Sequence, residues 1–99
     1  MTLQELTEEM HRFVASKGFY APDTARPQVP RNLAISLVLE ASEVLEHFQW
    51  GEAADPEELG DELADVALYL LQLASVSGID LEQSILNKLR KNQQREWPS

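Results

Sequence analysis

Two pairs of carboxylates with helical spacing are the residues of this sequence best placed to do chemistry. Glu40 and Glu43 are three positions apart, and Glu62 and Asp65 repeat that spacing further along the chain. Residues at i and i+3 share one face of a helix, with β-carbons about 5–6 Å apart, so each pair can converge on a cation. Carboxylates that face the interior of a helical bundle lower the stability of the fold unless they are paired or bound to metal. We therefore predict a metal site with four ligands: Glu40, Glu43, Glu62 and Asp65.

The ligand types indicate which metal this site would hold. The chain has no cysteine, so the ligands are oxygen atoms, which suit Mg²⁺ or Mn²⁺ better than zinc. Mg²⁺ usually keeps positions open for water and substrate phosphates, which favours phosphate chemistry over a closed structural site. A di-iron site in a helical bundle would need Glu-x-x-His on two helices. His47 follows Glu43 at a spacing of four, so two copies of that pattern are not present.

The charge distribution narrows the class of ligand. The formal net charge is −9, and residues 32–87 contain twelve Asp or Glu residues but no Lys or Arg. A protein that reads a nucleic-acid backbone gains its affinity from basic side chains, so a nucleic-acid polymer is a poor candidate partner. Four of the eight basic residues fall in the last twelve positions. The carboxylates of this acidic segment repel one another unless they are solvated or bind cations.

Length and composition predict a single domain over residues 1–99. The start of the chain lacks the basic and apolar regions of a secretory signal, and no stretch has the length of a membrane span. With the absence of cysteine, these features lead us to expect a cytoplasmic protein without a membrane partner.

Apolar periodicity predicts the helices that must position the carboxylates. Leucines, Met10, Phe13 and Val14 form the stripe of a first helix over about residues 2–17, and an irregular segment with three prolines spans 18–30. A second helix is expected from about Arg31 or Asn32, where Asn32 can cap it, to about Trp50.

The third and fourth helices have clear start signals. Asp55 followed by Pro56 predicts the start of a third helix that runs to about Ser77, and Asp80 can cap a fourth. Residues 63–76 are apolar around most of a helix circumference, so this helix should be buried on nearly all sides. Four helices of this length can hardly cover it. We therefore predict an all-α fold, an antiparallel four-helix bundle that assembles as a homo-oligomer, with a central helix in a monomeric bundle as the alternative.

The carboxylate pairs resemble a known family signature. Glu40-Ala41-Ser42-Glu43 followed by Glu62-Leu63-Ala64-Asp65 is similar to the E-x-x-E, then E-x-x-D signature of the MazG-like nucleotide pyrophosphohydrolases. Three further segments look like the branch that contains the dCTP pyrophosphatases: Pro30-Arg31-Asn32-Leu33, Phe48-Gln49-Trp50, and Lys88-x-x-x-Asn92-x-x-Arg95. The resemblance covers roughly residues 30–98. The segment 19–28 is longer than this branch leads us to expect.

The resemblance implies a fold and an activity. It implies a dimer or tetramer that converts a nucleoside triphosphate, dCTP-like, to the monophosphate and pyrophosphate. The four acids would bind magnesium, and Lys88, Asn92 and Arg95 would contact phosphates. Trp50 would help form the pocket for base or sugar, with a contribution across subunits, and His11 would face the base.

Two other functions fit the same sequence. One is a non-catalytic helical interaction module, in which the apolar third helix recruits a partner and the acids only solubilise the chain. The other is a related pyrophosphohydrolase that acts on dUTP or phosphoribosyl-ATP. Pyrophosphate release that depends on Mg²⁺ would separate the module from both enzymes.

Overall fold

The computed structural model describes residues 1–98, and that range contains four helices and no strand. The helices are α1 (Leu3–Ser16), α2 (Pro30–Glu46), α3 (Pro56–Val76) and α4 (Leu81–Gln94). The predicted all-α class and the number of helices are confirmed. The single domain predicted for residues 1–99 stays a prediction, and its last residue, Ser99, lies outside the described residues.

The predicted start signals of α3 and α4 act as helix caps. The Asp55 side chain accepts a hydrogen bond from the backbone N–H of Glu57 at 2.9 Å, and Pro56 takes the first helical position. Asp80 likewise accepts from the N–H of Gln83 at 3.0 Å. Each carboxylate satisfies an N–H group that has no partner within its helix, and its charge is favourable at that end of the helix dipole.

Glycines follow the ends of α1 and α3, as the sequence predicts. Gly18 has φ +75° and Gly78 has φ +71°, in the left-handed region that other residues rarely adopt. Their N–H groups donate back to Ala15 and Ser75, which ends each helix within one turn. The chain can therefore turn sharply at both points.

The start of α2 differs from the prediction. Val29 is the residue before the first turn and Pro30 takes the first helical position, so the predicted Asn32 cap is wrong. The Asn32 side chain instead donates to the carbonyl oxygen of Pro27 at 3.0 Å. Proline suits this place because its missing N–H would have no helical partner and its φ is already helical. The Asn32 side chain therefore holds the preceding loop against the start of α2 through this hydrogen bond.

The end of α2 also differs, because the helix stops at Glu46 and not near Trp50. The N–H groups of residues 47–49 bond to carbonyls three residues back, which tightens the chain into turns. Trp50 then lies in the loop before α3 with 93% of its surface exposed.

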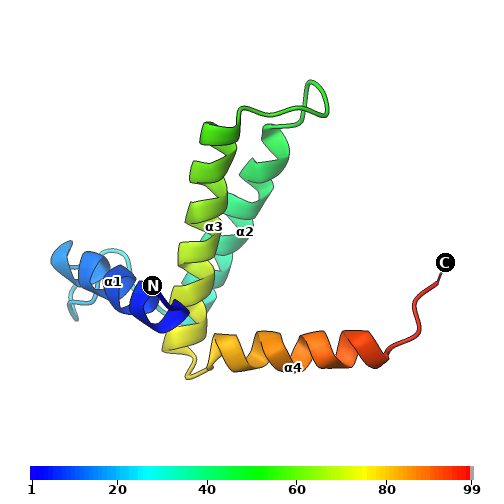
Figure 1. Cartoon of the computed structure of the whole chain (residues 1–99). Coiled ribbons are helices and arrows are strands. Elements are labelled where there is room, and N and C mark those ends of the chain that lie inside the picture. Colours follow the sequence, from blue (N-terminus) through cyan, green and yellow to red (C-terminus); the bar gives the residue numbers. More distant parts are fainter. Residues whose placement is uncertain (99) are drawn as a thin grey trace.

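α2 and α3 lie side by side as a helical hairpin, and α1 packs across the end of α3 that is remote from the hairpin loop (Figure 1). α2 and α3 share the most extensive contact between helices in the described chain. The buried apolar side chains lie where these three helices meet: Met10, Val14, Leu33, Leu71 and Ala74. The hairpin thus places the acids of α2 opposite those of α3.

α4 does not complete a four-helix bundle within one chain. It leaves the end of α3 at a bend of 102° and projects away from the hairpin (Figure 1). The radius of gyration is 16.1 Å, whereas a compact domain of this length would have about 13 Å. Within residues 1–98 no single helix is long and apolar enough to cross a membrane, and α3 with α4 would qualify only as this bent pair.

Candidate functional site

Three of the four predicted carboxylates meet between α2 and α3. Glu40, Glu62 and Asp65 each offer an oxygen atom, and these atoms all lie within 4.8 Å of one another. Glu40 comes from α2 and the other two from successive turns of α3, as their helical spacing requires. Glu40 and Glu62 are half-buried, whereas Asp65 is exposed. The cluster therefore has a shielded side and an open side.

Glu62 has the most perturbed environment of the cluster. Only 13% of its side chain is exposed, and its Oε2 atom is buried without a hydrogen-bond partner in the part of the chain that the structure describes. The pKa of Glu62 is raised to about 8, first by the adjacent carboxyl of Glu40, then by burial, and then by the carboxyl and negative charge of Glu43. A buried acceptor without a donor, among like charges, fits a cation-binding position. The donor set is composed of carboxylate oxygens, which suit a hard divalent cation.

Glu43 and His47 border the cluster on α2. Glu43 lies close enough to Glu62 to raise its pKa, but it is not among the three acids whose oxygen atoms converge. His47 Nε2 lies 4.0 Å from Glu62 Oε1. The sequence prediction did not include His47 in the site, although its spacing of four from Glu43 was a signal that both side chains lie on one face.

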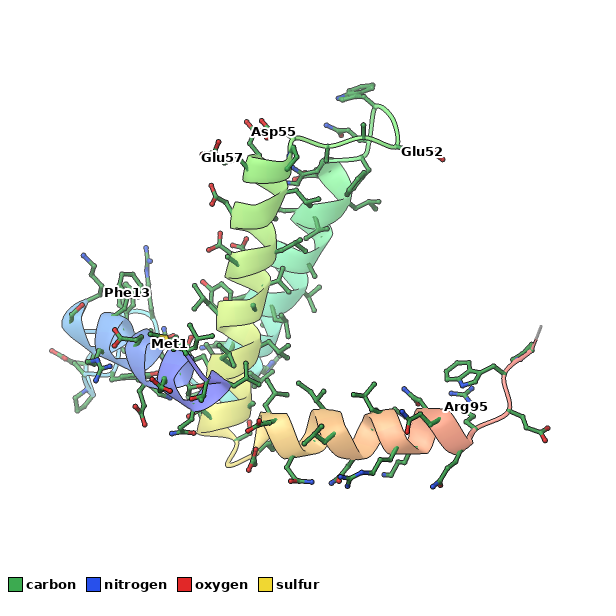
Figure 2. All side chains as sticks on the ribbon, in the orientation of Figure 1. Met1, Phe13, Glu52, Asp55, Glu57 and Arg95 are labelled. Carbon is green, nitrogen blue, oxygen red and sulfur yellow. The ribbon has the colours of Figure 1, made fainter. Side chains whose placement is uncertain are left out.

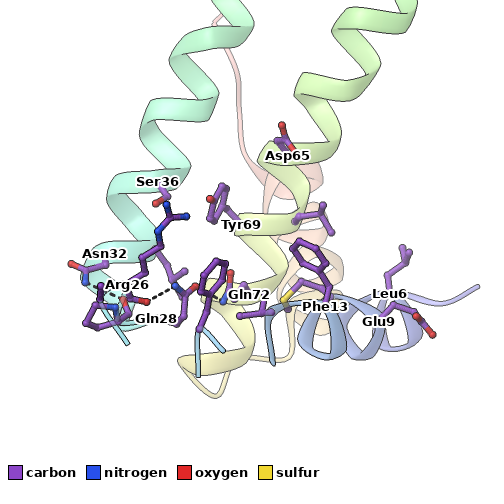
Figure 3. A pocket seen from close by; sticks show the side chains of 17 residues that line it. Leu6, Glu9, Phe13, Arg26, Gln28, Asn32, Ser36, Asp65, Tyr69 and Gln72 are labelled. Atoms are coloured by element: carbon purple, nitrogen blue, oxygen red, sulfur yellow. Dashed lines mark hydrogen bonds between the residues drawn. The ribbon is translucent and has the colours of Figure 1, made fainter. Parts of the chain in front are cut away.

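A pocket of about 580 Å³ begins beside Asp65 and extends toward α1 (Figure 3). Its walls come from α1, the loop 19–28, and the facing sides of α2 and α3. Most of the lining side chains are apolar or aromatic, among them Leu6, Met10, Phe13, Phe19, Leu33, Leu68 and Tyr69. Small-molecule sites commonly have volumes of about 300–1,000 Å³ with mainly apolar walls and a few polar groups. Asp65 thus belongs both to the acid cluster and to the lining of the pocket.

A family model described as MazG-like matches residues 35–98, which is more than half of the chain. The chain belongs to the MazG-like family. The matched range contains all four predicted acids and the whole of α3 and α4. The resemblance inferred from the two carboxylate pairs is therefore confirmed.

Relatives of this MazG-like chain carry informative names. It is 33% identical to rat dCTP pyrophosphatase 1 and 32% identical to the human protein of that name, over 95% of the chain. The chain spans 58% of the length of these relatives. A solved structure of a pyrophosphatase from Archaeoglobus fulgidus is 32% identical, with a TM-score of 0.77 over 98% of this chain and 93% of that one.

His11 does not line the pocket of the MazG-like site in the described chain. Its Nδ1 lies 2.5 Å from the Tyr20 hydroxyl and its Nε2 lies 2.7 Å from Ser75 Oγ. Gln72 donates to the Tyr20 oxygen, so the Tyr20 hydroxyl can donate to His11 Nδ1 and leave Nε2 to donate to Ser75. Both ring nitrogens are thus engaged, and the predicted contact of His11 with a base stays a prediction.

The basic tail predicted to contact phosphates lies far from the acids of its own chain. Arg95 is at the outer end of α4, away from the α2–α3 hairpin (Figure 2). At 1.5 Å per residue, α3 continues about 16 Å beyond Asp65, and α4 then runs about 20 Å in another direction. Lys88 and Asn92 are on the same helix. The structure therefore does not bring these three residues to the acid cluster within one chain, nor is Trp50 part of the pocket lining.

The raised pKa of Glu62 predicts how the metal-free protein responds to pH. Its pKa rises from an ordinary 4.5 to about 8 on folding, so between these values the folded carboxyl binds more protons than the unfolded one. The free energy of unfolding must then fall as the pH rises through this range. In a chelator, we expect the Tm to decrease from pH 5 to pH 8, and to decrease less in Glu62→Gln. Equal slopes in the two proteins would contradict this prediction.

Proposed function

We propose that this chain hydrolyses (deoxy)nucleoside triphosphates to the monophosphate and pyrophosphate with the help of Mg²⁺. The observation that carries the proposal is the buried, unpartnered Oε2 of Glu62 within the acid cluster at the mouth of an apolar pocket. The pocket can hold the nucleoside while the phosphates reach the carboxylates. The names of the rat and human relatives favour a dCTP-like substrate. The family resemblance favours a role in clearing surplus nucleotides from the cytoplasm.

Each part of the site has a task in this reaction. Attack of water on the α-phosphorus is mainly a matter of alignment and of neutralising phosphate charge. Glu40, Glu62 and Asp65, with Glu43 beside them, would hold Mg²⁺. When bound, Mg²⁺ supplies Lewis acidity and lowers the pKa of a coordinated water. A carboxylate that is not fully committed to the metal can accept the proton of the attacking water.

We further propose that the active form is a dimer or tetramer. α2 leaves Val38, Leu39 and Leu45 between 59% and 73% exposed, and α4 exposes Leu86 and Leu89 at 43% and 51%. Several large apolar side chains exposed along one helix favour an interface with a partner. Pairing of these surfaces would close the bundle that one chain leaves open. It would also allow the basic residues of α4 to approach the acids of a neighbouring copy.

A panel of nucleoside triphosphates with pyrophosphate detection tests the proposed function. We expect one or a few bases, dCTP foremost, to release pyrophosphate in Mg²⁺ and none to do so in excess chelator. At Mg²⁺ about tenfold above its Kd, ligand linkage predicts a Tm increase of about 5–10 °C. Absence of pyrophosphate from every triphosphate, in Mg²⁺ and in Mn²⁺, would reject the proposal. Preference for dUTP or phosphoribosyl-ATP would retain the reaction and change the substrate.

A further inference from the structure

Among residues 1–98, Arg26 is the only Lys or Arg that lines the pocket. Its guanidinium extends into the pocket between Ser36 and Tyr69 (Figure 3). It lies over the Phe19 ring, with Cζ 5.4 Å from the ring centroid. Among residues 1–98, Arg26 makes no ion pair with a carboxylate. A cation that points into a pocket without a protein anion is placed to meet an anionic ligand.

The neighbours of the Arg26 guanidinium show how far it lies from the acid cluster. Ser36 lies one helical turn before Glu40 on α2, and Tyr69 lies one turn after Asp65 on α3. Side chains four residues apart have β-carbons about 5–6 Å apart. Arg26 therefore lies roughly one turn from the acid cluster, between the carboxylates and the apolar part of the pocket.

Hydrogen bonds from the interior fix the segment that carries Arg26. Gln72 of α3 is only 3% exposed, and its amide donates to Gln28 Oε1 at 2.8 Å. The Gln28 amide in turn donates to the backbone carbonyl of Arg26 at 2.6 Å. On the other side, the Arg26 N–H donates to Thr24 Oγ1 at 3.1 Å. A buried amide thus holds the backbone of Arg26 in place while its side chain reaches the pocket.

We propose that Arg26 binds the phosphate that is attached directly to the nucleoside, the group at which hydrolysis occurs. This inference rests on the proposed function. We place the nucleoside in the apolar part of the pocket and the outer phosphates at the acid cluster. The α-phosphate between them then lies at the level of Ser36 and Tyr69. A guanidinium there can donate two parallel hydrogen bonds to phosphate oxygens. Gln28 and Gln72 are positioning residues that act through Arg26.

Binding of the reaction product tests this assignment without turnover. We would measure the affinities of dCMP and deoxycytidine by calorimetry for the wild type, Arg26→Gln, Arg26→Lys and the control Arg12→Gln. Arg12 is an exposed α1 residue outside the pocket lining. Arg26→Gln should weaken dCMP binding roughly tenfold to a hundredfold and leave deoxycytidine binding unchanged, because only the phosphate contact is lost. Arg26→Lys should retain part of the dCMP affinity.

Equal losses for dCMP and deoxycytidine, or no loss for either, would overturn the role of Arg26. These outcomes are distinct from failure of the proposed function. If the wild type releases pyrophosphate and Arg26→Gln binds dCMP normally, only the Arg26 assignment falls. If the wild type hydrolyses no triphosphate in the panel, the proposed function and this inference fall together.

A double-mutant cycle tests the positioning by Gln72. Gln72→Met preserves the length of the side chain but removes the amide that holds Gln28. It should weaken dCMP binding in the wild-type background and have little further effect in Arg26→Gln, since it acts through that residue. Fully additive losses would show that Gln72 supports the fold and does not position Arg26.

Discussion

Asp65→Asn should reduce the rate of pyrophosphate release by about a hundredfold to a thousandfold, the scale expected when one electrostatic contact to a developing charge is removed. Asparagine keeps the size of the side chain but removes the negative charge that Asp65 adds beside Glu40 and Glu62. A divalent cation would then be held by fewer carboxylates at the mouth of the pocket. The measurement is steady-state pyrophosphate release at saturating Mg²⁺ and nucleotide.

Asp61→Asn provides the matched control. Asp61 is also an exposed aspartate of α3, one turn earlier, but it does not belong to the converging cluster. It should keep the wild-type rate. In chelator, the Tm of Asp65→Asn should be no lower than that of the wild type, because the substitution relieves repulsion within the cluster. A rate loss with a lowered metal-free Tm would indicate damage to the fold, and an unchanged rate would remove Asp65 from the site.

Much of this site could be predicted because helical spacing is a local property. Spacing of three places both acids of a pair on one face, and a hairpin of two consecutive helices brings the faces together. The structure accordingly assembles Glu40, Glu62 and Asp65. Glu43 lies beside them and outside the converging group. The spacing of residues along α2 does not predict how that helix is rotated about its axis against α3, because the rotation depends on side-chain packing.

The remaining features depend on contacts between distant parts of the chain. The segment 18–30 has no periodicity, so its role in lining the pocket and the direction of the Arg26 side chain could not be read from the sequence. The hydrogen bond from the Gln72 amide to Gln28 joins residues that are 44 positions apart in the sequence. The sequence marked the start of α4 but not the 102° bend, since the turn after Gly78 permits several directions. The predicted closed bundle was therefore not found within one chain.

The direction of α4 creates a requirement for the proposed reaction. Lys88 and Arg95 are predicted to contact phosphates, yet their helix leaves the remote end of α3 and points away from the acids of its own chain. The exposed Leu86 and Leu89 lie on the same helix, which gives α4 an apolar surface for a neighbouring copy. A symmetric dimer would repeat every such contact twice, so each site could combine the acids of one copy with the tail of the other.

Subunit mixing turns this arrangement into a quantitative prediction. Asp65→Asn lacks a complete acid cluster, and the double substitution Lys88→Gln with Arg95→Gln lacks the tail cations, so each protein alone should be nearly inactive. In random dimers half of the particles are mixed, and each mixed dimer regains one intact site of two, so activity should recover to about one quarter of the wild-type value.

The measurement is pyrophosphate release after joint unfolding and refolding of equal amounts, with each variant refolded alone as the control. A mixture no more active than its separate components would show that each chain supplies its own tail, or that the tail does not act on the phosphates at all. Recovery, in contrast, could arise only if α4 of one copy serves the carboxylates of another, because no single chain in the mixture carries both halves of the site.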